Sequence, residues 1–129
     1  MNIKKIIIII TIIVLSLIIL LQWFYLFNQN YFIKKDFTKA FNYRITWNCS
    51  NFKNYTYNGS NLDNNCIDEK NRKSTPIKSF NILNISTTNW IAYLQVELVR
   101  KLDKESSYVI TYEMEKIDKN WKIKSDNKN

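Results

Sequence analysis

The stretch that decides the fold is residues 108–123, YVITYEMEKIDKNWKI. In its first half apolar and polar residues alternate, a period of two that is typical of a β-strand with one buried face. Residues 118–120 then supply a turn, after which Trp121 and Ile123 share one face of a short closing strand. The apolar positions of the first strand are Tyr108, Ile110, Tyr112 and Met114.

The same alternation occurs earlier in the chain, and the polar residues 101–107 between the two runs predict a hairpin turn. Both apolar sets occupy even positions, so paired residue numbers must sum to an even value if one face is to be apolar throughout. The predicted pairs are Leu94 with Tyr112 and Val96 with Ile110, open to a shift of two residues. The earlier apolar set is Trp90, Ala92, Leu94, Val96 and Leu98.

Residues 77–85 give a weaker strand pattern, and an amphipathic helix precedes the whole region. Its apolar stripe is expected to pack on the sheet, although a helix lying on a lipid surface is the alternative. The polar residues 28–30 precede this helix, which either starts there or continues the apolar segment before it. The stripe consists of Ile33, Phe37, Ala40, Phe41 and Ile45.

Residues 6–27 carry no charge and are almost wholly apolar. As a helix they are about 33 Å long, enough to cross a hydrocarbon core of about 30 Å. We therefore predict a short N-terminal tail at 1–5, a transmembrane anchor at 6–27 and an α+β domain at 28–129. The fold class is an N-terminal transmembrane helix, then an amphipathic helix on an antiparallel four-stranded meander. Membrane-interface aromatic residues are predicted at Trp23, Phe24, Tyr25 and Phe27.

A cleaved secretory signal peptide is the alternative to this signal-anchor. It needs small residues at a cleavage site, yet the first alanine of the chain is Ala40. Lys4 and Lys5 abut the apolar run, whereas Lys34 lies several residues beyond its other end. The positive-inside rule then favours a single-pass protein with a cytoplasmic N-terminus and an extracytoplasmic domain.

Residues 48–75 are rich in asparagine and predict a long loop. Cys49 and Cys66 flank its loosest part, and a loop this long is uncommon unless it is tied down. The only two cysteines of the chain are therefore expected to form a disulfide in an oxidising compartment. Two unpaired thiols are the alternative.

The order of elements resembles the cystatin-like, or nuclear-transport-factor-two-like, superfamily of helix-on-curved-sheet domains. The residues that carry the resemblance are 112–117, followed by the Trp-containing hairpin 118–123. Asn120 stands where a glycine is common, only one clear helix is expected, and no polar cluster is expected at the pocket positions. The resemblance implies a scaffold, often a membrane-anchored module of secretion or conjugation machinery.

Composition excludes several kinds of site. The chain has no histidine, so a catalytic histidine or a histidine metal ligand is excluded. One glycine cannot build a phosphate-binding loop, and two cysteines cannot complete a four-cysteine zinc site. No cofactor, no metal site and no enzymatic activity are expected. The net charge of +8 is attributed to a chain-wide excess of lysine, and nucleic-acid binding is not expected.

Two functions remain from the sequence. The first is a non-enzymatic structural or assembly component of an envelope complex, with the bilayer and other membrane or envelope proteins as partners and a homo-oligomer compatible with this role. The alternative is an anchored ligand-binding or inhibitory module, such as an immunity protein. The candidate interaction residues are Tyr93, Glu97, Glu113, Glu115, Lys122 and Lys124.

Overall fold

A computed structural model of the chain describes residues 2–58, 60–101 and 106–128, with side chains up to Asp126 in the last range. The chain divides into two compact units, Met1–Tyr31 and Phe32–Asn129. Helix α1 (Ile3–Ile45) contributes residues to both. The polar residues 28–30 do not interrupt it, because asparagine and glutamine only weaken a helix that contains neither glycine nor proline.

The first unit is helical and apolar. Among the described residues, α1 is the one helix long and apolar enough to cross a membrane, which is consistent with a membrane anchor or a signal sequence. The hydroxyl groups of Thr11 and Ser16 are satisfied inside the helix, where they donate to the carbonyl oxygens of Ile7 and Ile12 at 2.8 and 2.9 Å. Such internal bonding suits a segment that meets no water.

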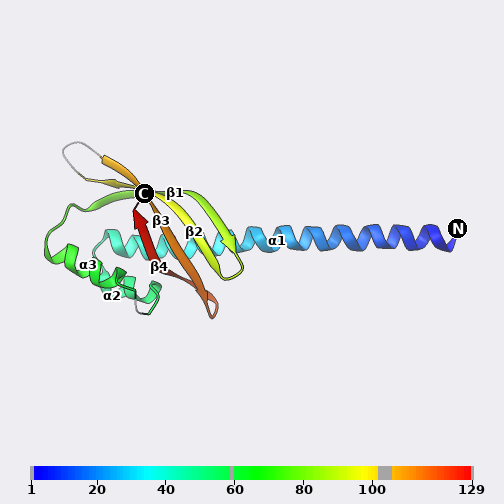
Figure 1. Cartoon of the computed structure of the whole chain (residues 1–129), viewed down its shortest axis with the longest axis horizontal. Helices are drawn as coiled ribbons and strands as arrows, with labels where there is room; N and C mark the ends of the chain where they lie inside the picture. Colours follow the sequence, from blue (N-terminus) through cyan, green and yellow to red (C-terminus); the bar gives the residue numbers. More distant parts are fainter. Residues whose placement is uncertain (1, 59, 102–105, 129) are drawn as a thin grey trace. The chain divides into compact units, whose positions relative to one another are not determined.

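The second unit contains a four-stranded antiparallel sheet in the order β1-β2-β3-β4 (Figure 1). The predicted α+β class and meander are confirmed, and so is the register, because Leu94 pairs with Tyr112 and Val96 with Ile110. Residues 102–105 of the expected turn lie outside the described residues. The strands are β1 (Ile77–Thr88), β2 (Ile91–Arg100), β3 (Ser106–Ile117) and β4 (Asn120–Lys128).

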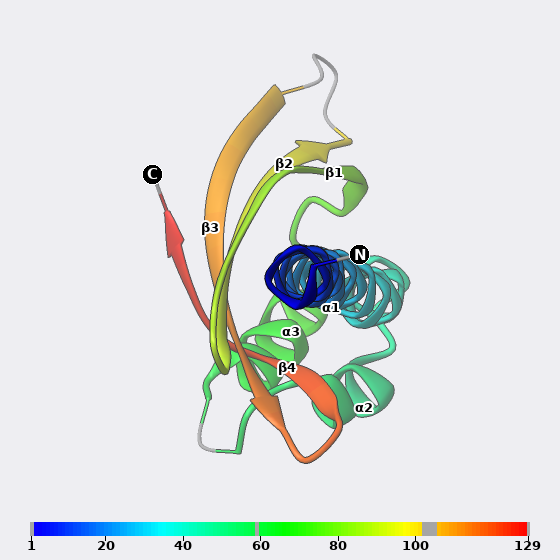
Figure 2. The same ribbon diagram turned by 90° about the vertical axis from the view of Figure 1, so that its right-hand side faces the viewer.

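The core lies between the concave face of this sheet and the helices, which are on one side of it (Figure 2). The predicted stripe of α1 is buried here, from Ile33 through Phe37 to Phe41. It packs against the even-numbered apolar residues of β2 and β3, as the parity of their positions predicts. Asp36 of α1 also accepts a hydrogen bond of 2.9 Å from the backbone nitrogen of Trp121, which ties the helix to β4.

The expectation of a long loop at 48–75 is wrong. Two helices and a 3-10 turn form there, because asparagine can begin a helix as well as occupy a loop: Asn48 precedes the first helix and Asn61 the second. Asn48 accepts a 3.3 Å hydrogen bond from the backbone of Asn51, and Leu62 and Cys66 bury one face of the longer helix. The elements are α2 (Cys49–Phe52), η1 (Lys53–Tyr55) and α3 (Leu62–Asn71).

The sulfur atoms of Cys49 and Cys66 lie 2.08 Å apart, a disulfide that joins α2 to α3. The two residues are 17 positions apart in the sequence. The predicted pairing is therefore present, although it links two helices rather than the ends of a loop.

Trp90 was expected on the buried face of β2, but its side chain is 62% exposed. The reason is that β1 runs to Thr88, so residues 89 and 90 form the turn, with Asn89 at a positive φ of 48°. The backbone nitrogen of Lys116 donates to the carbonyl oxygen of Trp90 at 2.8 Å, which fixes the turn beside β3.

Candidate functional site

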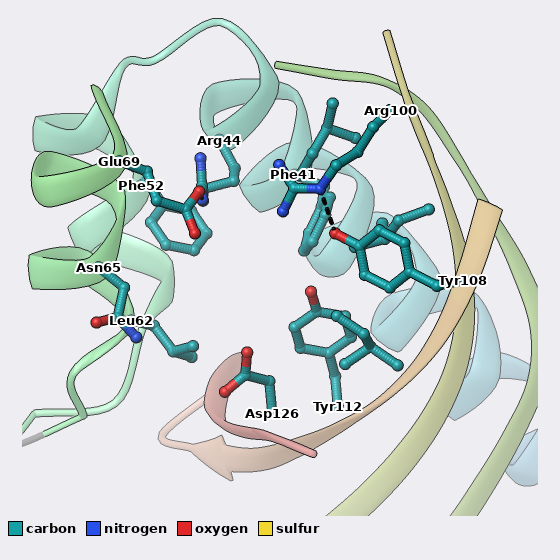
Figure 3. A pocket seen from close by; sticks show the side chains of 13 residues that line it. Phe41, Arg44, Phe52, Leu62, Asn65, Glu69, Arg100, Tyr108, Tyr112 and Asp126 are labelled. Atoms are coloured by element: carbon teal, nitrogen blue, oxygen red, sulfur yellow. Dashed lines mark hydrogen bonds and ion pairs between the residues drawn. The ribbon is translucent and has the colours of Figure 1, made fainter. Parts of the chain in front are cut away.

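A cavity of about 120 Å³ lies between the sheet and the helices (Figure 3). Residues from α1, α2, α3 and all four strands contribute to its walls. The apolar wall residues are Phe41, Phe52, Leu62, Ile77, Leu98 and Ile110. The polar ones are Arg44, Asn65, Glu69, Arg100, Tyr108, Tyr112 and Asp126.

Tyr112 is positioned by the aromatic residues of α1. Its ring lies 5.3 Å from that of Phe37 and 5.2 Å from that of Phe41, measured between ring centres. The residue is only 5% exposed, and its hydroxyl group points into the cavity (Figure 3). No described residue forms a hydrogen bond with that hydroxyl group. Burial raises the pKa of Tyr112 well above its ordinary value, with Asp126 adding to the rise, so the group remains protonated at neutral pH.

Asp126 faces the same cavity because β4 contains a bulge. Simple alternation from Ile123 would place position 126 on the outer face, beside Lys124. The register shifts between Glu113 and Met114 instead, so Asp126 pairs with Tyr112. An extra residue in one strand reverses which face the following side chains occupy. Ser125 consequently turns outward.

Arg100, the last residue of β2, lies at another part of the cavity wall. Its Nε donates to the hydroxyl oxygen of Tyr108 at 2.8 Å, and a terminal nitrogen donates to the carbonyl oxygen of Thr75 at 2.6 Å. The guanidinium carbon also lies 5.4 Å from the centre of the Tyr108 ring. These contacts fix the orientation of Arg100, but both hydrogen-bond acceptors are neutral.

Arg44 and Glu69 form an ion pair between α1 and α3, with side chains 10% and 26% exposed. The guanidinium of Arg44 also lies 5.0 Å from the ring centre of Trp47. The pair holds α3 over the cavity. It also neutralises two of the four charges in the wall, so Arg100 and Asp126 are the charged groups without an oppositely charged partner among the described residues.

The interaction residues predicted from the sequence lie on the opposite, outer side of the sheet. Tyr93 and Glu113 are brought together, with the phenol oxygen 3.4 Å from a carboxylate oxygen, and Ser125 donates to the same carboxylate at 3.1 Å. Lys124 and Glu115 form an ion pair of 3.6 Å. Glu97 and Lys122 belong to other rungs of the same face, opposite Val109 and Glu115 respectively.

The expectation that the pocket positions lack a polar cluster is wrong. The alternation predicts Tyr108 and Tyr112 on the buried face as apolar residues. It does not indicate that both also line a polar cavity. Arg44 belongs to the last turn of α1 and Glu69 to a helix that was not predicted, so their pairing had no signal in the sequence. No group of three metal-binding side chains occurs within residues 2–58, 60–101 and 106–128.

No protein-family model matches the chain, and no curated protein matches it in sequence. Among solved structures, it is similar to an NTF-2-like protein of unknown function from Shewanella oneidensis MR-1. The identity is 20%, the TM-score is 0.55, and the match covers 72% of this chain and 95% of that one. It is also similar to a SEC-C motif containing protein from Rhodopseudomonas palustris, with 7% identity, a TM-score of 0.57, and 69% and 72% coverage.

Similarity at these identities concerns the fold alone, because one fold serves many functions. The nuclear-transport-factor-two-like part of the predicted resemblance is confirmed as a fold. Its cystatin-like and membrane-anchored parts remain predictions.

Proposed function

We propose that the chain is a membrane-anchored binding module that holds a small polar ligand in the cavity between its helices and sheet. The observation that carries the proposal is the hydroxyl group of Tyr112, which points into the cavity, is protonated at neutral pH and makes no hydrogen bond to the described residues. A ligand that accepts from this hydroxyl group gains a hydrogen bond, which contributes about 1 kcal/mol with a neutral acceptor and roughly 1.5–3 kcal/mol with a charged one.

The size and chemistry of the cavity limit what it can hold. A dry cavity of about 150 Å³ accommodates benzene, so about 120 Å³ suits a ligand of roughly five or six non-hydrogen atoms. The walls of this cavity combine apolar side chains with fixed polar groups, the two kinds of contact that hold and orient a small molecule. We favour binding over catalysis, because the chain has no histidine to act as a base. The raised pKa of Tyr112 keeps its phenol protonated at neutral pH, so this group cannot accept a proton either.

We further propose that α1 remains attached as an anchor, with the N-terminus in the cytoplasm and the domain outside. Lys4 and Lys5 at the start of the apolar helix support this orientation. The Cys49–Cys66 pair supports it as well, because disulfides persist in oxidising compartments.

Isothermal titration calorimetry of the full chain in detergent tests the binding function. The probes are glycine, alanine, acetate, methylammonium and ethylene glycol. We expect at least one to bind, and Tyr112→Phe to weaken that binding by about tenfold, the value of one good hydrogen bond. Tyr93→Phe is the matched control, since that hydroxyl group lies on the outer face. If none of the five binds at millimolar concentration, the cavity serves only water and the proposal fails.

The assembly role remains the second candidate, and the β1–β2 hairpin is the observation that favours it. Leu83, Trp90 and Tyr93 are large apolar side chains of this hairpin that remain exposed. Exposed apolar groups of this kind mark contacts with a bilayer, another envelope protein or a second copy of the chain. Crosslinking of the full chain in its membrane, with Trp90→Ala as the variant, tests this role. A stoichiometric partner that Trp90→Ala loses would support it, and an uncrosslinked monomer would exclude it.

A further inference from the structure

The charges of the cavity wall indicate which class of small ligand the site takes, an inference that rests on the function proposed above. Arg44 and Glu69 compensate each other through their ion pair. Arg100 bonds only neutral oxygen atoms, and Asp126 has no hydrogen bond or ion pair within the described part of the chain. The wall thus offers one uncompensated positive charge and one uncompensated negative charge.

These two charges lie at different ends of the site. Arg100 is bonded to Tyr108, whereas Asp126 is opposite Tyr112 in the sheet. The two tyrosines are four positions apart on β3, which is about 14 Å between their Cα atoms in an extended strand. The hydroxyl group of Tyr112 points into the space between Arg100 and Asp126 (Figure 3).

Partly buried charges are stabilised when a group of opposite sign replaces the water they lose. A simple anion would leave Asp126 without a partner and would be repelled by its negative charge. A simple cation would leave Arg100 without a partner and would be repelled by its positive charge. A ligand with both a carboxylate and an ammonium group complements both ends. Tyr112 then donates to a carboxylate oxygen of the ligand, with its hydroxyl group already protonated.

We infer that the cavity binds a small zwitterion of the α-amino acid class, with the carboxylate toward Arg100 and Tyr112 and the ammonium toward Asp126. Glycine has five non-hydrogen atoms and alanine six, which matches the size limit set by a cavity of about 120 Å³. The volume of the cavity leaves little room for a larger side chain.

The test compares glycine with its two halves, acetate and methylammonium, by calorimetry on the full chain in detergent. Glycine should bind at least tenfold more tightly than either half. Asp126→Asn should weaken glycine binding by about 10- to 100-fold, the range of hydrogen bonds to charged groups, while acetate binding stays equal or improves. Within the part of the chain that the structure describes, the Asp126 side chain makes no hydrogen bond or ion pair that this isosteric change would break.

Asp118→Asn is the matched control, because it makes the same chemical change in the exposed β3–β4 turn at a positive φ that asparagine tolerates. It should leave glycine binding within twofold of wild type. If acetate or methylammonium binds as tightly as glycine, or Asp126→Asn leaves glycine binding unchanged, the zwitterion inference is overturned while binding as such stands. If no probe binds, the proposed function fails as well.

Discussion

The hydroxyl group of Tyr112 is the residue-scale feature that separates this cavity from an ordinary gap in a core. A phenylalanine would make the same ring contacts with Phe37 and Phe41. Packing therefore does not explain the hydroxyl group, which points into the cavity and makes no hydrogen bond to the described residues. Its raised pKa has a consequence for stability that needs no ligand.

At alkaline pH we expect Tyr112 to destabilise the fold. Its pKa is about 10 in the unfolded chain and higher in the folded one, so folding favours the protonated form. The resulting stability is fully present below about pH 10 and is lost as the pH rises above it. The unfolding free energy of wild type, minus that of Tyr112→Phe, should be constant near neutral pH and fall by up to ~1.4 kcal/mol per unit above pH 10.

Urea denaturation of both chains at neutral pH and at about pH 11 measures this difference. The titration of the other tyrosines affects both chains equally and therefore cancels in this difference. Tyr93→Phe, on the outer face, serves as control and should show no such alkaline change. If the difference in unfolding free energy between wild type and Tyr112→Phe is the same at both pH values, Tyr112 is solvated in the folded protein.

The contributions of Arg44 and Glu69 to the unfolding free energy should depend strongly on each other. Arg44→Met leaves the partly buried carboxylate of Glu69 without its partner, and we expect a loss of about 2–3 kcal/mol in unfolding free energy. The double variant Arg44→Met with Glu69→Leu should recover most of it, because no uncompensated charge remains. A double-mutant cycle in urea measures the coupling.

The outer-face pair of Lys124 and Glu115 is the comparison for that cycle. Its side chains are 40% and 30% exposed and 3.6 Å apart, so water screens the interaction. Its coupling should be below about 1 kcal/mol. Equal coupling in the two pairs would show that burial adds nothing to the Arg44–Glu69 pair.

At the scale of elements, the sequence predicts those parts in which periodicity alone sets the geometry. The even-numbered apolar positions of β2 and β3 predict both the buried face and the pairing of Leu94 with Tyr112. Alternation fails where the strand is irregular. The bulge near Lys124 directs Asp126 inward, and nothing in the local composition signals it. The candidate site was therefore missed although the sheet was predicted.

The region 48–75 fails for another physical reason. Asparagine favours turns and helix caps through the same side-chain hydrogen bond to the backbone, so its abundance does not separate a loop from short capped helices. Tertiary contacts decide, here the burial of Leu62 and Cys66 and the ion pair from Glu69 to Arg44.

The β3–β4 hairpin should depend on Trp121. The side chain is 1% exposed and belongs to the hydrophobic core, so Trp121→Ala should cost about 3 kcal/mol or more in unfolding free energy. Trp90→Ala, the same change at an exposed turn, should cost less than about 1 kcal/mol. Chemical denaturation of the two variants gives the comparison, and similar losses would contradict the assigned core.

The disulfide should contribute about 3 kcal/mol, because it closes a loop of 17 residues in the unfolded chain. Replacing Cys49 and Cys66 together with alanine should lower the unfolding free energy by that amount. Hydrogen exchange should rise most in α2 and α3, the elements that the bond joins. Thiol alkylation of the denatured wild type without reductant should label neither cysteine, and labelling of both would refute the bond.

At the scale of the whole molecule, the membrane prediction and the disulfide prediction constrain each other. An uncleaved anchor with the domain outside requires three results from one membrane preparation. The chain should have the intact mass, resist alkaline extraction, and lose its domain to protease added from the extracytoplasmic side. The Cys49–Cys66 bond should be formed in the same sample, because that compartment is oxidising.

A shortened, soluble chain with the bond intact would instead identify the apolar part of α1 as a signal sequence. A domain that is protected from the protease and has free thiols would show the opposite orientation. The binding site would then face the cytoplasm and its ligands.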